Sequence, residues 1–269
     1  MKTNISNDVL SAAIAAVRSQ RPLVHNITNY VVMNNSANAL LAIGASPVMA
    51  HWTEEMEEMV SIAGALVINI GTLDSEWLAG MKTAGVAASR RGIPIVLDPV
   101  GAGATSQRTS AVVELIELCK PTIIRGNGSE IMAVAKAFKC DNESDTESIR
   151  SKGVDSSAQS SDAVEAAKSL ARKSEAVVVI SGETDYITDG NLVYTVEGGD
   201  PIMTAVTGMG CTATALTGAF AAVCDDPMTA AVSAMAVMSL CGERAAALAR
   251  GNGSMQINFL DELYSLQTL

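Results

Sequence analysis

Ala65-Leu-Val-Ile-Asn-Ile70 and Ile93-Pro-Ile-Val-Leu97 are short apolar runs, separated by a segment with helical spacing near Ser75 to Arg91. Runs of this length, bounded by Gly, Asp or Pro, are typical of buried strands. A strand, a helix and a second strand in this order predict a crossover connection between parallel neighbours. These residues therefore predict an α/β fold.

The same alternation continues along the chain. Further strands are predicted at Thr122-Ile-Ile124 and Ala176-Val-Val-Val-Ile180, and further helices near Ser106 to Cys119 and Asn127 to Phe138. Tyr186-Ile-Thr-Asp-Gly-Asn-Leu-Val-Tyr194 has the pattern of a β-hairpin, which predicts antiparallel strands at one edge of the sheet. We expect a mainly parallel central sheet with helices on both faces, in a single domain spanning residues 1–269.

Composition narrows the classes of partner. Of the 269 residues, 48% are hydrophobic and 17% charged, which indicates a packed globular protein. The net charge is −11 and there is no basic run, so we expect neither a nucleic-acid partner nor an anionic membrane surface. A polyanionic substrate must then be held by helix N-termini, a few basic side chains and a metal ion.

The cysteines and the N-terminal segment indicate the cellular compartment of the protein. Five cysteines without metal-ligand spacing favour a reduced, cytoplasmic setting. The run from Val9 to Val17 is amphipathic and lacks the basic start of a signal peptide. No window is expected to approach the roughly 18 uncharged apolar residues of a membrane span. Residues 141–161 are rich in Ser, Asp and Glu, and we expect an exposed loop there.

Ligands of parallel α/β sheets gather beyond the carboxyl ends of the strands. The segments that follow the predicted strands are therefore candidates for the site. They are Gly71-Thr72, Asp98-Pro-Val-Gly-Ala-Gly103, Arg125-Gly-Asn127 and Ser181-Gly-Glu183.

A glycine-broken turn runs into a helix at Ala205-Val-Thr-Gly-Met-Gly-Cys-Thr-Ala-Thr-Ala-Leu216. Gly208 and Gly210 allow close approach of an anion, and a helix beginning at about Cys211 adds unpaired N–H donors and the positive end of its dipole. A phosphate is the natural ligand. The alternative is a plain helix start with a buried thiol, and the protonation state of Cys211 stays open, because the helix dipole and a bound polyphosphate act in opposite directions.

Arg125-Gly-Asn-Gly-Ser-Glu130 supports two interpretations. Asn127 and Glu130 have the spacing of a helix capping box. Alternatively, Glu130 binds Mg²⁺ directly or through water while Arg125 contacts nucleotide phosphates. Asp98 is either a second acidic group near the metal or a loop cap.

Taken together, four motifs resemble one family. Thr207-Gly-Met-Gly-Cys211, Asp98-Pro-Val-Gly-Ala102, Arg125-Gly-Asn-x-Ser-Glu130 and His25-Asn-Ile-Thr-Asn-Tyr30 are similar, in order and spacing, to those of hydroxyethylthiazole kinases, thiamine-salvage enzymes of the ribokinase-like superfamily. The resemblance implies a three-layer α/β/α fold and phosphorylation of the primary hydroxyl of 4-methyl-5-(2-hydroxyethyl)thiazole with ATP and Mg²⁺. It also implies a homotrimer with active sites between subunits.

The resemblance assigns roles residue by residue. It implies a thiazole pocket of Asn26, Thr28, Met49 and Gly208, an ATP site with Arg125, Ser181 and Asn127, metal binding by Glu130 and Asp98, and catalytic roles for Cys211, Gly208 and Gly210. From the residues alone, Asn26 and Thr28 would be interpreted as helix caps and Met49 as core.

Cys211 stands where many ribokinase-like enzymes carry an aspartate base, so we expect it to have a modest base or orienting role. Two other functions stay open: a kinase for another alcohol, such as a hydroxymethylpyrimidine or a sugar, and a non-catalytic binder of thiazole or nucleotide. A cysteine hydrolase is disfavoured because neither His25 nor His51 lies in a segment expected near Cys211, and both histidines are interpreted as structural.

Overall fold

The computed structural model describes residues 1–140 and 156–268. Its strands form one sheet in the order β1-β9-β8-β7-β6-β5-β4-β2-β3. In chain order they are β1 (Lys2–Thr3), β2 (Leu23–Ile27), β3 (Ser46–Val48), β4 (Ala65–Asn69), β5 (Ile95–Asp98), β6 (Ile123–Asn127), β7 (Val177–Ser181), β8 (Thr184–Thr188) and β9 (Val193–Glu197).

The sheet is parallel from β3 to β7 and antiparallel at one edge. Strands β2 to β7 pair in parallel through crossover connections, whereas β8, β9 and β1 pair antiparallel. The predicted strands and the predicted hairpin are all present. All parallel strands therefore end at the same edge of the sheet, where the candidate segments meet.

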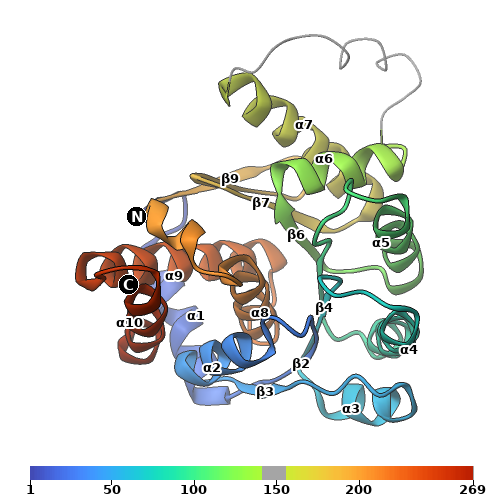
Figure 1. Cartoon of the computed structure of the whole chain (residues 1–269), viewed down its shortest axis with the longest axis horizontal. Helices are drawn as coiled ribbons and strands as arrows, with labels where there is room; N and C mark the ends of the chain where they lie inside the picture. Colours follow the sequence, from blue (N-terminus) through green and yellow to red (C-terminus); the bar gives the residue numbers. More distant parts are fainter. Residues whose placement is uncertain (141–155, 269) are drawn as a thin grey trace.

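Helices cover both faces of the sheet (Figure 1). One face carries α3 to α7, and the other carries α1, α2, α8, α9 and α10. The helices are α1 (Asn7–Gln20), α2 (Met33–Ile43), η1 (Thr53–Glu55), α3 (Met56–Ile62), α4 (Ser75–Arg91), α5 (Ser106–Cys119), α6 (Gly128–Ala137), α7 (Ser156–Ser174), η3 (Pro201–Ala205), α8 (Met209–Ala221), α9 (Pro227–Leu248) and α10 (Asn252–Ser265).

Strand alternation builds the two cores. In β4, Leu66 and Ile68 face the α3–α7 layer, whereas Val67 faces the layer that contains α8. Because successive side chains of a strand point to opposite faces, a strand buried on both sides has to be apolar throughout. The continuous apolar runs in the sequence therefore have a direct cause in the three-layer arrangement.

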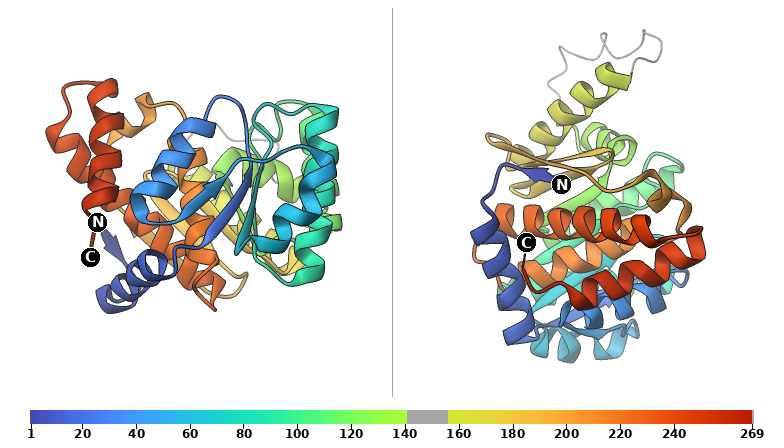
Figure 2. Two further views of the ribbon diagram at one scale, coloured as in Figure 1. Left: turned by 90° about the horizontal axis from the view of Figure 1, so that it is seen from below. Right: turned by 90° about the vertical axis from the view of Figure 1, so that its left-hand side faces the viewer.

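Helix α9 lies in the core on the α8 side of the sheet and packs against α8 and α10; Figure 2 shows α9 and α10 side by side. By length and composition, it is the one helix of the described residues that could cross a membrane, with a mean hydropathy of 1.3. The expectation that no window approaches this length was wrong. Buried residues make up 67% of the apolar stretch, as in the core helix of a packed domain.

Two further expectations need correction. Helix α8 begins at Met209 rather than near Cys211, because Gly208 adopts the left-handed conformation of the N-cap at φ +87°. The expected loop at 141–161 is helical from Ser156, where α7 begins. Residues 141–155 lie outside the described part of the chain.

Candidate active site

A chain of buried hydrogen bonds joins the ends of β2, β4 and β5 to α8. The Asn29 amide donates to Asn69 Oδ1 at 2.8 Å, and the Asn69 amide donates to Asp98 Oδ2 at 2.8 Å. The same Asp98 oxygen accepts from the Thr214 hydroxyl at 2.7 Å. Asn69 and Asp98 are register partners and the last residues of adjacent strands, so the sheet itself places them together.

The carboxyl group of Asp98 is almost completely shielded from solvent. Its side chain is buried, and burial raises its pKa to about 6 against the opposing effects of Arg125 and Thr214. Arg125 Nη1 lies 4.0 Å from Asp98 Oδ2, too far for a direct hydrogen bond. At neutral pH, Asp98 is therefore a carboxylate stabilised by neutral donors and by one nearby cation.

Asp98→Asn is expected to make the metal-free protein more stable at pH 7.5, by up to about 3 kcal/mol, and to lose that advantage near pH 4. Between the ordinary aspartate pKa of 3.8 and about 6, the native state binds more protons than the unfolded chain. The free energy of unfolding of the wild type therefore falls as the pH rises through this window. An asparagine oxygen still accepts both hydrogen bonds but carries no charge.

Urea unfolding of both proteins in EDTA at several pH values between 4 and 8 measures this effect. Asp185 also has a pKa raised to about 6, but it is present in both proteins and cancels in the difference. A stability difference that does not change with pH would contradict the assignment to Asp98.

The start of α8 presents free backbone donors. The first backbone hydrogen bond of the helix runs from Thr212 N–H to Gly208 O. The N–H groups of Met209, Gly210 and Cys211 are therefore left without an acceptor among the described residues. An added Cβ at Gly208 would lie 2.7 Å from Val32 Cγ1. Glycine is thus needed there both for its positive φ and for the contact with α2.

Arg125 links this helix to β6 and β7. Its Nη1 donates to Gly210 O at 2.8 Å and its Nη2 donates to Ser181 Oγ at 2.5 Å. The side chain is buried, and its Nε has no partner among the described residues. The structure therefore brings together Arg125, Ser181 and Gly210, as the sequence predicted.

Cys211 lies at the third position of α8. Asn29 Nδ2 contacts its Sγ at 3.5 Å, and burial, together with the charge of Asp98, raises the pKa of the thiol. These effects outweigh the nearby amides and Arg125. Burial and the charge of Asp98 therefore favour the protonated thiol in the ligand-free protein.

The capping-box interpretation of Asn127 and Glu130 is confirmed. Asn127 Oδ1 accepts from Glu130 N at 2.9 Å, and Glu130 Oε2 accepts from Asn127 N at 2.9 Å. Glu130 Oε1 also accepts from Gly101 N at 2.8 Å, which ties the loop after β5 to α6. Each carboxylate oxygen keeps a lone pair for a further donor or cation.

Arg108 positions the neighbouring loops. Its guanidinium donates to the carbonyl oxygens of Ile70, Gly71 and Val100 at 2.7 to 2.8 Å. One side chain of α5 thus holds together the loops that follow β4 and β5.

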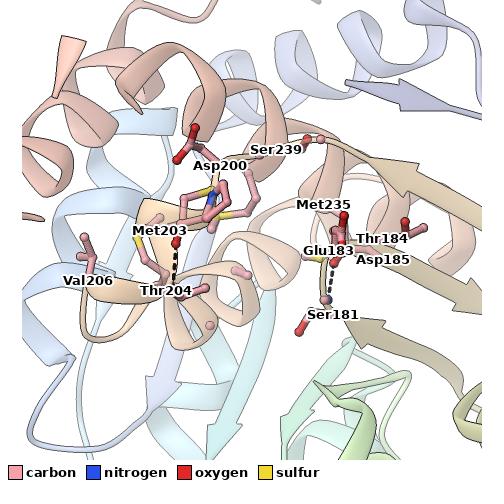
Figure 3. Close-up of a pocket in the computed structure, with 18 of the residues that line it drawn as sticks. Ser181, Glu183, Thr184, Asp185, Asp200, Met203, Thr204, Val206, Met235 and Ser239 are labelled. Atoms are coloured by element: carbon pink, nitrogen blue, oxygen red, sulfur yellow. Dashed lines mark hydrogen bonds between the residues drawn. The ribbon is translucent and has the colours of Figure 1, made fainter. Parts of the chain in front are cut away.

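A cavity of about 1010 Å³ opens beside Arg125, between the start of α8, the β8–β9 hairpin, η3 and α9 (Figure 3). Its lining includes Ser181, Gly208 and Gly210, together with the methionines Met203, Met235 and Met238. Among the described residues that line it, Arg125 is the one basic residue, and the acidic residues are Glu183, Asp185, Glu197 and Asp200. The cavity has the size of a small-molecule site, with its positive charge at one end.

Asn26, Thr28 and Met49 lie at the ends of β2 and β3, on the opposite side of β4 and β5 from Arg125 and Ser181. Asn26 is inside β2, and its Oδ1 has no partner in the described part of the chain; Thr28 follows the strand, so the helix-cap interpretation of both was wrong. Met49 follows β3 and is half-buried rather than core. None of the three lines the cavity.

The two histidines occupy structural positions. His25 is buried in β2 with Nε2 2.9 Å from Ala50 O, and burial lowers its pKa. His51 stacks on Trp77, with ring centroids 4.3 Å apart.

Sequence reasoning assigned no role to Asn29, Asn69, Thr214 or Asp185. Asn69 could have been recognised from the sequence, because it is the polar residue at the end of an otherwise apolar strand. The other three became identifiable only from contacts across elements.

Comparison with solved structures identifies the fold of the protein. A ribokinase-like superfamily protein from Enterococcus faecalis V583 aligns over 97% of this chain and 96% of its own, with a TM-score of 0.63 and 14% identity. The fold is therefore ribokinase-like, as expected from the motifs.

Closer relatives identify the family. A hydroxyethylthiazole kinase structure from Pyrococcus horikoshii OT3 is 41% identical, covers 96% of this chain and 94% of its own, and has a TM-score of 0.86. A hydroxyethylthiazole kinase from Syntrophus aciditrophicus (strain SB) is 54% identical over 255 residues, which are 95% of this chain and 91% of that relative. The model of the hydroxyethylthiazole kinase family matches residues 14–268. The chain belongs to the hydroxyethylthiazole kinase family.

Proposed function

We propose that this protein transfers the γ-phosphoryl group of ATP to the primary hydroxyl of 4-methyl-5-(2-hydroxyethyl)thiazole, in thiamine biosynthesis or salvage. One observation carries the proposal beyond family membership. The free N–H groups that begin α8 border the cavity with Arg125 and Ser181, and this cavity and the residues Asn26, Thr28 and Met49 of β2 and the segments after β2 and β3 lie on opposite sides of β4 and β5 in the sheet. Donor and acceptor substrates on these two sides would meet at the helix N-terminus.

ATP is assigned to the cavity beside Arg125. Arg125, the one cation that the described residues contribute to the cavity, lies beside the α8 N-terminus, which suits the triphosphate. Ser181 is held within that end by its bond from Arg125. Asn127 is assigned to the same nucleotide region, although its side-chain oxygen already caps α6.

Glu130 and Asp98 are the residues that we assign to Mg²⁺. The described residues contain no group of three or more His, Cys, Asp or Glu side chains able to enclose a metal. Mg²⁺ commonly uses one or two carboxylates, several waters and substrate phosphates, and these two carboxylates fit that requirement. When bound, the ion would neutralise charge on the phosphates.

The residues act mainly by positioning and by electrostatics. Phosphoryl transfer has a loose transition state that needs in-line alignment and stabilisation of charge more than early removal of the alcohol proton. The N–H groups of Met209, Gly210 and Cys211 donate to the transferring group, and Arg125 stabilises its negative charge. The protonated thiol of Cys211 orients the alcohol rather than acting as a strong base.

Cys211→Asp is expected to keep kcat within about threefold of wild type or to raise it, because a carboxylate can accept the alcohol proton. Cys211→Ser serves as the near-isosteric control and should stay within about tenfold of wild type. Steady-state rates of ADP formation measure both variants. A folded Cys211→Asp protein without activity would point to a thiol-specific or covalent role.

The proposed reaction is tested by mass spectrometry of thiazole phosphate and ADP after mixing the purified protein, Mg²⁺-ATP and the alcohol. Phosphorylated thiazole that forms only with Mg²⁺ supports the substrate and the metal together. A hydroxymethylpyrimidine and a sugar in parallel reactions test the alternative alcohols. ATP binding without any phosphorylated product would contradict the proposal.

We further propose a single-domain cytoplasmic protein that assembles as a homotrimer with active sites between subunits. Tyr30, Val31 and Trp52 are 62 to 65% exposed, and they flank the segments that carry Thr28 and Met49. Large apolar side chains that are exposed beside the proposed thiazole-binding residues suit burial by another copy. Sedimentation velocity measures the mass of the assembly, and a monomer at micromolar concentration would contradict this part.

A further inference from the structure

Asp185 is an unusual group in a cavity meant for a polyanion. It is the second residue of β8, lines the cavity beside Arg125 and is half-buried, whereas Glu183, Glu197 and Asp200 of the same lining are exposed. A carboxylate removed from water and close to phosphate groups is costly unless donors compensate it.

The protein supplies Asp185 with one donor. Gly182 N–H donates to its Oδ1 at 3.0 Å, and no other hydrogen bond or ion pair to this carboxylate is found among the described residues. Arg125 is near enough to lower the pKa of Asp185 electrostatically, but it directs its own hydrogen bonds to Gly210 and Ser181. Burial raises the pKa to about 6, so at neutral pH the group is a carboxylate with one oxygen available.

Asp185 and Arg125 line the same cavity, so the group that donates a hydrogen bond to the available oxygen of Asp185 should belong to the part of the ligand next to the phosphates. In a nucleoside triphosphate, the ribose is the unit directly attached to the phosphates, and its hydroxyl groups are neutral donors. A carboxylate is the acceptor that nucleotide sites commonly use for ribose hydroxyls. The thioethers of Met203, Met235 and Met238 line the same cavity and suit an apolar ring surface.

Resting on the proposed ATP site, we propose that Asp185 is a specificity-determining residue that accepts a hydrogen bond from a ribose hydroxyl of the phosphate donor. The protein thereby distinguishes ribonucleotides from deoxyribonucleotides. Hydrogen bonds to charged groups are strong enough that loss of this one should cost roughly tenfold to a hundredfold in kcat/KM.

The test compares ATP with 2′-deoxy-ATP and 3′-deoxy-ATP on the full chain. For the wild type, we expect kcat/KM to fall about tenfold or more with at least one deoxy donor. In Asp185→Asn, the amide oxygen can still accept from Gly182, so the turn is preserved. The –NH2 group can form at most a weaker, neutral hydrogen bond with the hydroxyl, so the ATP-to-deoxy ratio should drop severalfold below that of the wild type. The KM for the thiazole alcohol should not change.

Asp200→Asn is the matched control. Asp200 also lines the cavity and also accepts from a backbone amide, that of Ile202 at 2.9 Å, but it is exposed. The control should keep the wild-type ratio between ATP and the deoxy donors. A ratio lost equally in both variants would assign the effect to the general charge of the cavity and overturn the proposal.

Other outcomes also overturn it. A wild type that does not distinguish the donors, or an Asp185→Asn variant that slows all donors equally, would leave Asp185 only a turn-shaping role. An increased Mg²⁺ requirement with an unchanged ratio would assign the carboxylate to the metal. Calorimetric binding of ATP and the deoxy analogues without thiazole compares their affinities even if no thiazole phosphate forms, so failure of the proposed reaction is recognised separately.

Discussion

Arg125→Met is expected to lower kcat/KM by about a thousandfold, since an arginine that stabilises a transferring phosphoryl group contributes 10³ to 10⁵. The substitution keeps most of the apolar stem but removes the one cation found among the described residues of the cavity lining. It also removes the bonds that hold Gly210 O and Ser181 Oγ in place. Most of the loss should be in kcat, because charge develops in the transition state. Initial rates over a matrix of ATP and alcohol concentrations separate the two constants.

Arg108→Met is the matched control for this experiment. Arg108 is also a guanidinium bonded to backbone carbonyls near the site, but it does not line the cavity. Its loss should lower the thermal midpoint and change kcat/KM far less than the loss of Arg125. If the folded Arg125→Met protein kept more than a tenth of wild-type kcat/KM, phosphate stabilisation by Arg125 would be wrong.

Gly210→Val is expected to lower kcat by about a hundredfold to a thousandfold, the range seen when a donor to a developing anion is removed. An added Cβ would lie 3.2 Å from Arg125 Nη1, so the guanidinium has to shift, and the branched side chain would cover the free N–H groups of α8. Gly210 is not among the glycines with positive φ, so the helix itself should form. Single-turnover measurements at saturating substrates report this loss directly.

Two other glycines control for helix effects. Gly253 occupies the second position of α10, as Gly210 does in α8, and an added Cβ there meets no atom of the described residues within 4 Å. Gly253→Val should therefore leave kcat near wild type. Gly208→Val should lower stability as well as activity, because φ is +87° and Val32 lies too close. Equal losses in the variants of Gly210 and Gly253 would indicate a general helix effect instead of a blocked anion site.

The architecture was predictable because each buried parallel strand had to be apolar and each had to be followed by a turn. Arg125, Ser181 and Gly210 were predictable as neighbours for the same reason, since strand ends and a helix start converge at one edge. Asp98 was recognised as a strand-end acid, but its bonds to Asn69 and Thr214 depend on strand order and on the position of α8, which no local pattern encodes. The start of α8 was misplaced because the conformation of Gly208 depends on its contact with α2.

Arg125 is already held at two points before any nucleotide arrives. A free arginine side chain has about 2 kcal/mol of rotamer entropy, and a site that immobilises it during binding loses affinity by that amount. Here the loss occurs when the protein folds, through bonds to its own helix and strand. The guanidinium therefore meets the triphosphate as a rigid, preorganised charge, and its attraction can act on the transition state without a cost for ordering the side chain.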